Sequence, residues 1–167
     1  MGRTRQFDED TVVRAAVELF ATRAYDGISV DDLVTHLGVH RNSLYKTFGS
    51  KKGLYLVALR RHADDHVRPL AEALGSAADL EQAARLITAA PLDLLLVSAV
   101  ERAPYDPEVA EVVARAFGDL DRALAGLLPD ALASAFTAAL LGVRLRARAT
   151  GPSTEDLAGA LAHRLGE

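Results

Sequence analysis

Cysteine is absent from the sequence, and this excludes a disulfide scaffold, a thiol redox switch and any zinc site built on cysteine. Proline and glycine are also scarce, with 6 and 12 among 167 residues, and no low-complexity tract or short internal repeat occurs. Half of the residues are hydrophobic, so the chain can bury a sizeable core. Its length fits one domain, or two small domains that share a core.

Long hydrophobic runs are missing as well. The longest, residues 92–100, contains Asp93 and is far too short to cross a bilayer. The first ten residues, MGRTRQFDED, are polar throughout, so we expect no signal peptide. These features predict a cytoplasmic protein without a membrane segment.

Familiar signatures of catalysis are not found. The sequence contains no HExxH, no GxSxG and no glycine-rich phosphate loop. The polar residues around position 100 are expected at helix edges or along a pocket: Asp93, Ser98, Glu101 and Arg102. His62 and His66 have the i, i+4 spacing that can hold a metal ion, but two ligands do not make a site. We predict no enzyme, metal or cofactor, and a solvated helix face for these histidines.

Charge is distributed unevenly along the chain, whose net charge is −4. Residues 1–66 hold ten Lys/Arg and nine Asp/Glu, a net +1, whereas residues 67–167 hold nine and fourteen, a net −5. A nucleic-acid-binding surface is therefore expected in the first half. Arg3 and Arg5 lie in a short N-terminal tail, which is either a disordered stub with phosphate contacts at most or an arm that reaches DNA.

The stretch from Ser29 to Phe48 has the most informative pattern. Ser29 is a good N-cap, and Asp32, three residues later, completes a capping box. Apolar residues then follow the i, i+3, i+4, i+7 spacing of a helix with one buried face: Val30, Leu33, Val34 and Leu37. Gly38 ends this helix, because glycine takes positive φ without steric cost. A second helix is expected from about His40 to Thr47.

The second helix exposes an unusual set of side chains. Only Leu44, with Tyr45 as a further candidate, is expected to face the core. The remaining polar residues can all donate hydrogen bonds, and no acid occurs from His40 to His62. A short, donor-rich helix after a glycine turn suits docking in the major groove of DNA. The alternative is an ordinary solvated face in a helical bundle, since such turns are common in all-α proteins.

The run from residue 10 to residue 59 resembles the N-terminal domain of the tetracycline-repressor (TetR) family of transcription regulators. The matching residues are Ala15, Ala16, Leu19, Phe20, Tyr25, Ser29, Val30, Leu33, Leu37, Gly38, Val39, Leu44, Tyr45, Phe48, Ser50 and Lys51. Three residues depart from the family pattern: Ala24 and Asn42 replace common glycines, and His40 replaces a small hydroxyl residue. These departures bear on the operator sequence and not on the module.

The resemblance and the donor-rich helix together imply specific roles at DNA. We assign Arg41, Asn42 and His40 to base edges, and Ser43 to bases or phosphates. Phosphate contacts are expected from Tyr45, Lys46, Lys51 and Lys52, the last two at the positive start of the next helix. The predicted DNA-binding residues are Ser29, His40, Arg41, Asn42, Ser43, Tyr45, Lys46, Lys51 and Lys52.

The second half of the chain predicts about five helices. Their starts are marked by Asp79, Pro91, the Asp106-Pro107-Glu108 run, Pro129 and a capping box in residues 153–156. Inward-facing residues of the last two helices are expected to be Leu132, Phe136, Ala139, Leu140, Val143, Leu157, Leu161 and Leu165. The fold class is therefore all-α with about nine helices, in which a long helix joins a three-helix helix-turn-helix module to a C-terminal bundle. We divide it into residues 1–50, which bind DNA, and residues 51–167, which dimerise and bind ligand.

These features predict a sequence-specific transcriptional regulator, in the first instance a repressor. Its expected partners are palindromic operator DNA, a second copy bound through the last two helices, and a small, largely apolar effector. The candidate effector-binding residues are Leu92, Leu96, Arg102, Tyr105, Phe117 and Phe136. A fully packed core without a cavity is the alternative to the pocket. A helical protein-binding adaptor is the alternative to the regulator, and retention on DNA at low salt separates the two.

Overall fold

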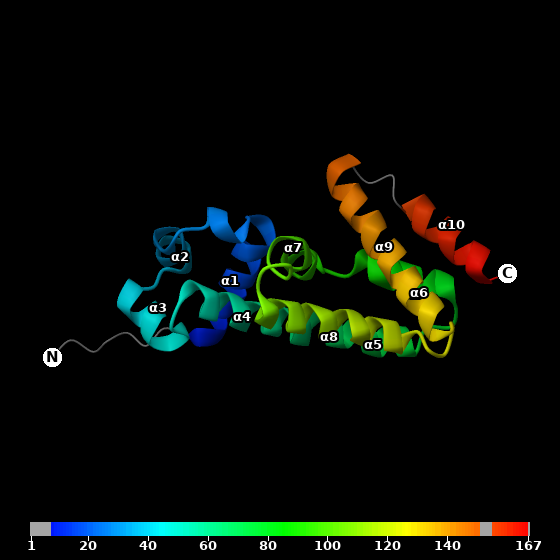
Figure 1. Ribbon diagram of the computed structural model, residues 1–167, viewed down its shortest axis with the longest axis horizontal. Helices are drawn as coiled ribbons and strands as arrows, with labels where there is room; N and C mark the ends of the chain where they lie inside the picture. Colours follow the sequence, from blue (N-terminus) through cyan, green and yellow to red (C-terminus); the bar gives the residue numbers. More distant parts are fainter. Residues whose placement is uncertain (1–7, 151–154, 167) are drawn as a thin grey trace. The chain divides into compact units, whose positions relative to one another are not determined.

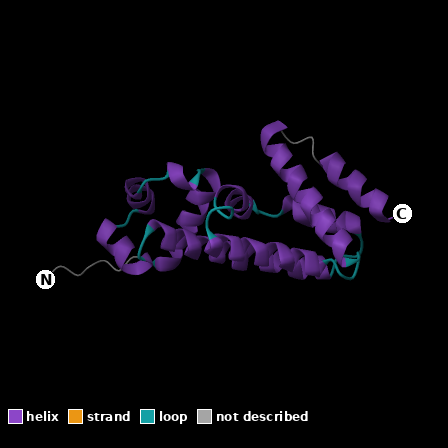
Figure 2. Ribbon diagram, in the orientation of Figure 1, coloured by secondary structure: helices purple, strands orange, loops and turns teal. Residues whose placement is uncertain are grey.

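A computed structural model describes residues 8–150 and 155–166, and this part of the chain contains helices and no strands (Figures 1 and 2). The α-helices are α1 (Glu9–Thr22), α2 (Val30–Leu37), α3 (Arg41–Phe48), α4 (Lys51–His62), α5 (Arg68–Gly75), α6 (Leu80–Ala89), α7 (Asp93–Glu101), α8 (Pro107–Ala123), α9 (Asp130–Thr150) and α10 (Glu155–Gly166). A short 3-10 turn, η1 (Tyr25–Gly27), precedes α2, and a π segment, η2 (Ala63–Val67), joins α4 to α5. If α4 and α5 are counted as one helix, the described residues form nine, as predicted.

The chain divides into two compact units. The first combines residues 1–62 with residues 93–112, and the second combines residues 63–92 with residues 113–167. The predicted functional boundary between residues 50 and 51 stays a prediction. Among the described residues, no single helix is both long and apolar enough to cross a membrane.

In the first unit, α1 packs against α2, α4 and α7. Its core includes the fully buried side chains of Phe20, Leu33, Leu44, Leu54 and Tyr55. The rings of Phe20 and Tyr55 meet edge to face, with centroids 4.9 Å apart. The Tyr55 hydroxyl lies 2.7 Å from the Ser98 hydroxyl of α7, which also donates to the Leu94 carbonyl. Ser98 therefore satisfies a buried tyrosine, which explains a polar residue in an otherwise apolar helix.

In the second unit, α9 and α10 both pack against α6 (Figure 1). Ile87, Phe136 and Leu140 are buried at this junction, with 1 % exposure or less. Arg144 of α9 donates from Nη1 to the carbonyls of Ile87 at 3.0 Å and Thr88 at 2.8 Å, and also to the carbonyl of Ala90. Ile87 and Thr88 lie in the last turn of α6 and Ala90 is its C-cap residue, so Arg144 caps the C-terminal end of that helix.

Most of the expected helix starts are confirmed. The Asp79 side chain accepts from the Gln82 N–H at 2.7 Å, and Asp106 accepts from the Glu108 N–H at 3.1 Å. Asp8 occupies the N-cap position of α1, and its carboxylate accepts from the Thr11 hydroxyl. The expectations for the tail arginines and for the capping serine at residue 153 fall outside the described residues.

Two burial predictions were wrong for the single chain. Leu132, Leu157 and Leu165 are 45 %, 47 % and 38 % exposed, and Ala139 is exposed as well. Their helices bury another stripe, which includes Ala133, Phe136, Leu140, Ala158 and Ala162. His62 was expected on a solvated face, but only 3 % of it is exposed, because it ends the buried stripe of α4.

Candidate nucleic-acid interface

The helix before the docking helix is fixed by local sequence. The Ser29 side chain accepts from the Asp32 N–H at 3.0 Å, and the Asp32 carboxylate accepts from the Ser29 N–H at 2.8 Å. This capping box starts α2, and Gly38 ends it with φ +65°. Both ends of α2 therefore match the prediction. Because the Ser29 hydroxyl is used within this box, its contribution to the surface is the orientation of α2.

The docking helix α3 is held by one buried residue. Leu44 is fully buried, whereas His40, Arg41, Asn42 and Lys46 are exposed. Tyr45 is 38 % exposed, so its ring does not enter the core, and Ser43 is partly exposed. Among the described residues, His40, Asn42 and Lys46 make no side-chain hydrogen bond or ion pair that would keep them from an outside partner. The face predicted from sequence is thus a real surface.

Arg41 differs from its neighbours on α3, because it already has a protein partner. Its Nη2 lies 2.5 Å from Oδ1 of Asp31, a residue in the first turn of α2. This hydrogen bond is the main reason that the pKa of Arg41 is raised above its usual value. The pair connects α2 to α3 across the turn and leaves half of the Arg41 side chain exposed.

Lys51, the first residue of α4, points toward the 3-10 turn. Its ammonium donates to the Tyr25 carbonyl at 2.5 Å and lies 4.0 Å from the centroid of the Tyr25 ring. Burial lowers the pKa of Lys51 below its usual value. The Arg102 guanidinium is also positioned over the Tyr25 ring, 4.5 Å from its centroid. Lys51 therefore holds the loop between α1 and α2 in place, a role that the sequence did not indicate.

Lys52 is bound by two carboxylates at the start of α8. Its ammonium lies 3.0 Å from Oδ2 of Asp106 and 2.5 Å from Oε2 of Glu108. The hydrogen bonds to Glu108 and Asp106 raise the pKa of Lys52. Because its ammonium is already paired with Asp106 and Glu108, Lys52 is a weaker candidate for a phosphate contact than Lys46.

The corner between α3 and α4 depends on a glycine that sequence reasoning missed. Ser50 caps α4, since its hydroxyl accepts from the Gly53 N–H at 2.9 Å. A Cβ on Gly53 would lie 1.9 Å from the Phe48 carbonyl oxygen, far inside van der Waals contact. Only glycine fits there. The sequence did contain a signal for this: glycine is unfavourable within a helix, so a glycine in the first turn indicates that a larger residue does not fit.

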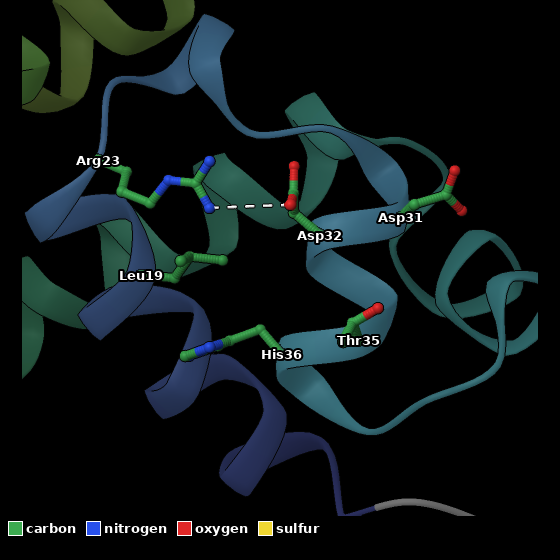
Figure 3. Close-up of a pocket in the computed structure, with 6 residues that line it drawn as sticks. All are labelled: Leu19, Arg23, Asp31, Asp32, Thr35 and His36. Carbon is green, nitrogen blue, oxygen red and sulfur yellow. Dashed lines mark ion pairs between the residues drawn. The ribbon is translucent and has the colours of Figure 1, made fainter.

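A surface hollow of about 350 Å³ lies beside this interface, between α1 and α2 (Figure 3). Its lining residues are Leu19, Arg23, Asp31, Asp32, Thr35 and His36. Arg23 and Asp32 form an ion pair at 3.8 Å across it, and the Asp31 carboxylate points away from that pair. No group of three or more metal-binding side chains occurs among the residues that the structure describes.

The sequence profile of the bacterial regulatory proteins of the tetR family matches residues 12–58, which cover most of α1 to α4. Over 134 residues the chain is 33 % identical to YezE of Bacillus subtilis (strain 168), an uncharacterized HTH-type transcriptional regulator. That alignment covers 74 % of this chain and 69 % of YezE. The chain belongs to the TetR family.

Solved TetR-type structures share the fold over nearly the whole chain. The structure of SCO1917, a TetR-family member from Streptomyces coelicolor, superposes with a TM-score of 0.77 at 20 % identity, over 94 % of this chain and 96 % of that one. The regulator CifR, complexed with a 26-base-pair operator DNA, gives a TM-score of 0.73 at 23 % identity, over 98 % and 97 %. At this identity, the likeness concerns the fold.

Membership in the TetR family makes this protein a DNA-binding transcriptional regulator and not an enzyme. The adaptor alternative is not favoured. The exposed α3 face therefore has the position and the chemistry of a recognition helix. Which of its residues contact bases or phosphates stays a prediction.

The six candidate effector residues of this TetR-family protein fall in both compact units. In the first unit, Leu96 is buried, Arg102 is bound to Asp106 at 3.5 Å, and Tyr105 is 81 % exposed. In the second unit, Leu92 and Phe136 are buried and Phe117 is partly exposed. An effector pocket built from them stays a prediction.

Proposed function

We propose that this TetR-family regulator binds inverted-repeat operator DNA as a homodimer and represses transcription until an effector releases it. The observation that carries the proposal is the face of α3, which Leu44 anchors and which presents donors and no acid. Repression is favoured because more of the named relatives are repressors than activators, among them BdcR of Escherichia coli (strain K12), which is 37 % identical over 73 residues. That match covers 44 % of this chain and 37 % of BdcR. Such a protein works where the chromosome is, so we place it in the cytoplasm.

The proposed roles at DNA follow the contacts on the surface. Arg41, Asn42 and His40 read base edges in the major groove, and Ser43 contacts bases or phosphates. Tyr45 and Lys46 contact phosphates, since both are exposed on the same short helix. For Lys51 and Lys52 we propose a structural role in place of the phosphate contacts expected from the sequence, because Lys51 is bound to Tyr25 and Lys52 to Asp106 and Glu108.

Dimerisation through α9 and α10 is supported by apolar residues that the single chain leaves exposed. Leu132, Leu157 and Leu165 are each more than a third exposed, and small residues of α9, including Ala135 and Ala138, are exposed as well. A two-fold four-helix arrangement would cover these side chains and bring their backbones close together. Two recognition helices would then read half-sites about 34–36 Å apart in the simplest case.

The proposed effector is a small, largely apolar molecule. Leu92 and Phe136, which belong to the same unit, are apolar and support this chemistry. Such a ligand changes DNA affinity only through its differential affinity for two states of the protein. A ligand screen by thermal shift tests this part: a binder should raise the midpoint and weaken operator binding. A screen without any shift would leave a constitutive DNA binder.

Selection of bound sequences from random DNA with the purified protein tests the central proposal. The expected outcome is a consensus with two inverted half-sites. A directly repeated or asymmetric consensus would contradict the two-fold dimer, and no enrichment at all would contradict sequence-specific binding.

A further inference from the structure

Asp31 is an acid beside the docking helix, and phosphate binding does not explain its presence there. It lies in the first turn of α2, and 81 % of its side chain is exposed. Its carboxylate is 2.5 Å from the guanidinium of Arg41, the first residue of α3. An acid at this position repels phosphates, so it weakens the attraction of the surface for DNA of any sequence.

Stability of the fold does not explain the ion pair either. Both side chains are at least half exposed, and exposed pairs of this kind contribute little to the folded state. Local structure does not explain the pair, because the dipole of α2 favours an acid in its first turn whether or not that acid meets Arg41, and α2 is capped by Ser29 and Asp32. The remaining consequence of the pair is the orientation that it gives to Arg41.

Orientation matters because of how arginine reads a base. A guanidinium has five N–H donors in one plane, and a bidentate contact to guanine O6 and N7 uses two of them. Asp31 is bonded to Nη2, and the donors that it does not use remain available on the exposed half of the side chain. A guanidinium already held in one plane loses less conformational freedom on binding.

We propose that Asp31 is a positioning residue for base recognition, which holds Arg41 for a bidentate contact with a guanine in each half-site. This inference rests on the proposed function and deepens it by naming the base and the second residue involved. The charge of Asp31 lowers the affinity for DNA of any sequence. Its hydrogen bond to Arg41 increases the discrimination between bases at one base pair.

The test compares Asp31→Asn, which removes the charge and leaves a neutral amide oxygen that holds the guanidinium less strongly, with a control that removes the same charge elsewhere. Glu18→Gln is that control, because Glu18 is an exposed acid on α1 of the same unit. Binding is measured by fluorescence anisotropy on the selected operator, on operators with single base changes, and on random DNA. Arg41→Ala identifies which base pair Arg41 reads. Thermal unfolding of each variant should match the wild type, since Asp31, Glu18 and Arg41 are all exposed.

Asp31→Asn is expected to reduce discrimination at the Arg41 base pair by up to about fivefold, because Arg41 itself is retained and fivefold is the lower end for the loss of a good bidentate contact. Binding to random DNA should strengthen in Asp31→Asn and remain nearly unchanged in Glu18→Gln. In the Arg41→Ala background, Asp31→Asn should cause no further reduction of base preference.

The proposal is overturned if Asp31→Asn strengthens binding to all sequences equally and leaves the base preference intact. It is also overturned if the weakened preference lies at a base pair that Arg41→Ala does not affect, or is not for guanine. Failure of the proposed function looks different, because the wild-type protein would then not distinguish its selected operator from random DNA.

Discussion

The ammonium of Lys52 lies 3.0 Å from the carboxylate of Asp106, which is only 5 % exposed. Asp106 also accepts from the Glu108 N–H at 3.1 Å and pairs with Arg102 at 3.5 Å. One buried carboxylate therefore starts α8 and binds the first turn of α4. This network lies within the unit that contains α3. It includes Lys52, which the sequence predicted to contact a DNA phosphate.

Lys46→Ala and Lys52→Ala should separate the two roles of these lysines. Lys46 is exposed on α3, so its removal should lower the slope of log affinity against log salt by about 0.9 for each phosphate that is no longer neutralised. Lys52→Ala should leave this slope unchanged and lower the thermal midpoint, because Asp106 is deprived of a partner. Salt titrations of operator binding and thermal unfolding measure both. If both variants lower the slope equally, Lys52 also contacts a phosphate, and the prediction is wrong.

Acid should destabilise the protein partly through Asp106. Burial raises the pKa of this carboxyl, but the Lys52 hydrogen bond and the backbone N–H groups of Val109 and Glu108 outweigh it, so the pKa lies below its usual 3.8. A lowered folded-state pKa contributes stability that is present above about pH 3.8 and is lost as the pH falls through the folded value. The free energy of unfolding should therefore fall in this acid range.

Asp106→Asn isolates this contribution, because the amide oxygen can still accept the backbone N–H groups that begin α8. The variant should be less stable than the wild type near neutral pH, and the difference should shrink below about pH 3.8. Thermal midpoints measured from about pH 7 to about pH 2 give both curves. A difference that stays constant over this range would exclude the ion pair as its source.

Gly53→Ala should disrupt the corner that positions the recognition helix. The added Cβ would lie 1.9 Å from the Phe48 carbonyl oxygen, so the backbone must move, at a cost of about 1–3 kcal/mol in the free energy of unfolding. Operator affinity should fall as well. Gly75→Ala is the matched control, since nothing lies within 4 Å of a Cβ there and it should not destabilise. Urea titration measures the free energy of unfolding of the two variants. Equal values would contradict the predicted clash at Gly53.

Leu157→Glu should produce a folded monomer that no longer binds its operator. Leu157 is 47 % exposed in the single chain, so a charge there spares the core but would be buried in the proposed interface. Sedimentation velocity should show half the mass of the wild type. Val100→Glu is the control, because Val100 is an exposed apolar residue on α7, with 62 % exposure. A wild-type protein that sediments as a monomer at micromolar concentration would contradict the interface itself.

Local structure around the site could be predicted from the sequence because its determinants are short range. The Ser29–Asp32 capping box, the positive φ of Gly38 and the cap at Asp79 each depend on residues within a few positions of one another. The exposed face of α3 followed from the single buried Leu44, since helical periodicity fixes which residues lie opposite it.

Partners between distant segments could not be predicted in the same way. Lys52 and Asp106 are 54 positions apart, and Arg144 lies 57 positions from the Ile87 carbonyl that it caps. For a surface lysine, or for an arginine in an amphipathic helix, the neighbouring residues in the sequence do not indicate which group it will contact. The exposure of Leu132 and Leu157 could not be predicted either, because an apolar stripe on a helix does not reveal whether it packs against its own chain or against a second one.

The sequence by itself determined the helices, their ends, the TetR-type module and the polar face of α3, since propensity, capping and periodicity act over one or two turns. The tertiary structure alone decided how the cations are used. It placed Arg41 on Asp31, Lys51 on Tyr25 and Lys52 on Asp106, and left Lys46 exposed. The physical reason is that charge interactions depend on distance in space, and the packing of α2, α3 and α4 within the first unit sets those distances.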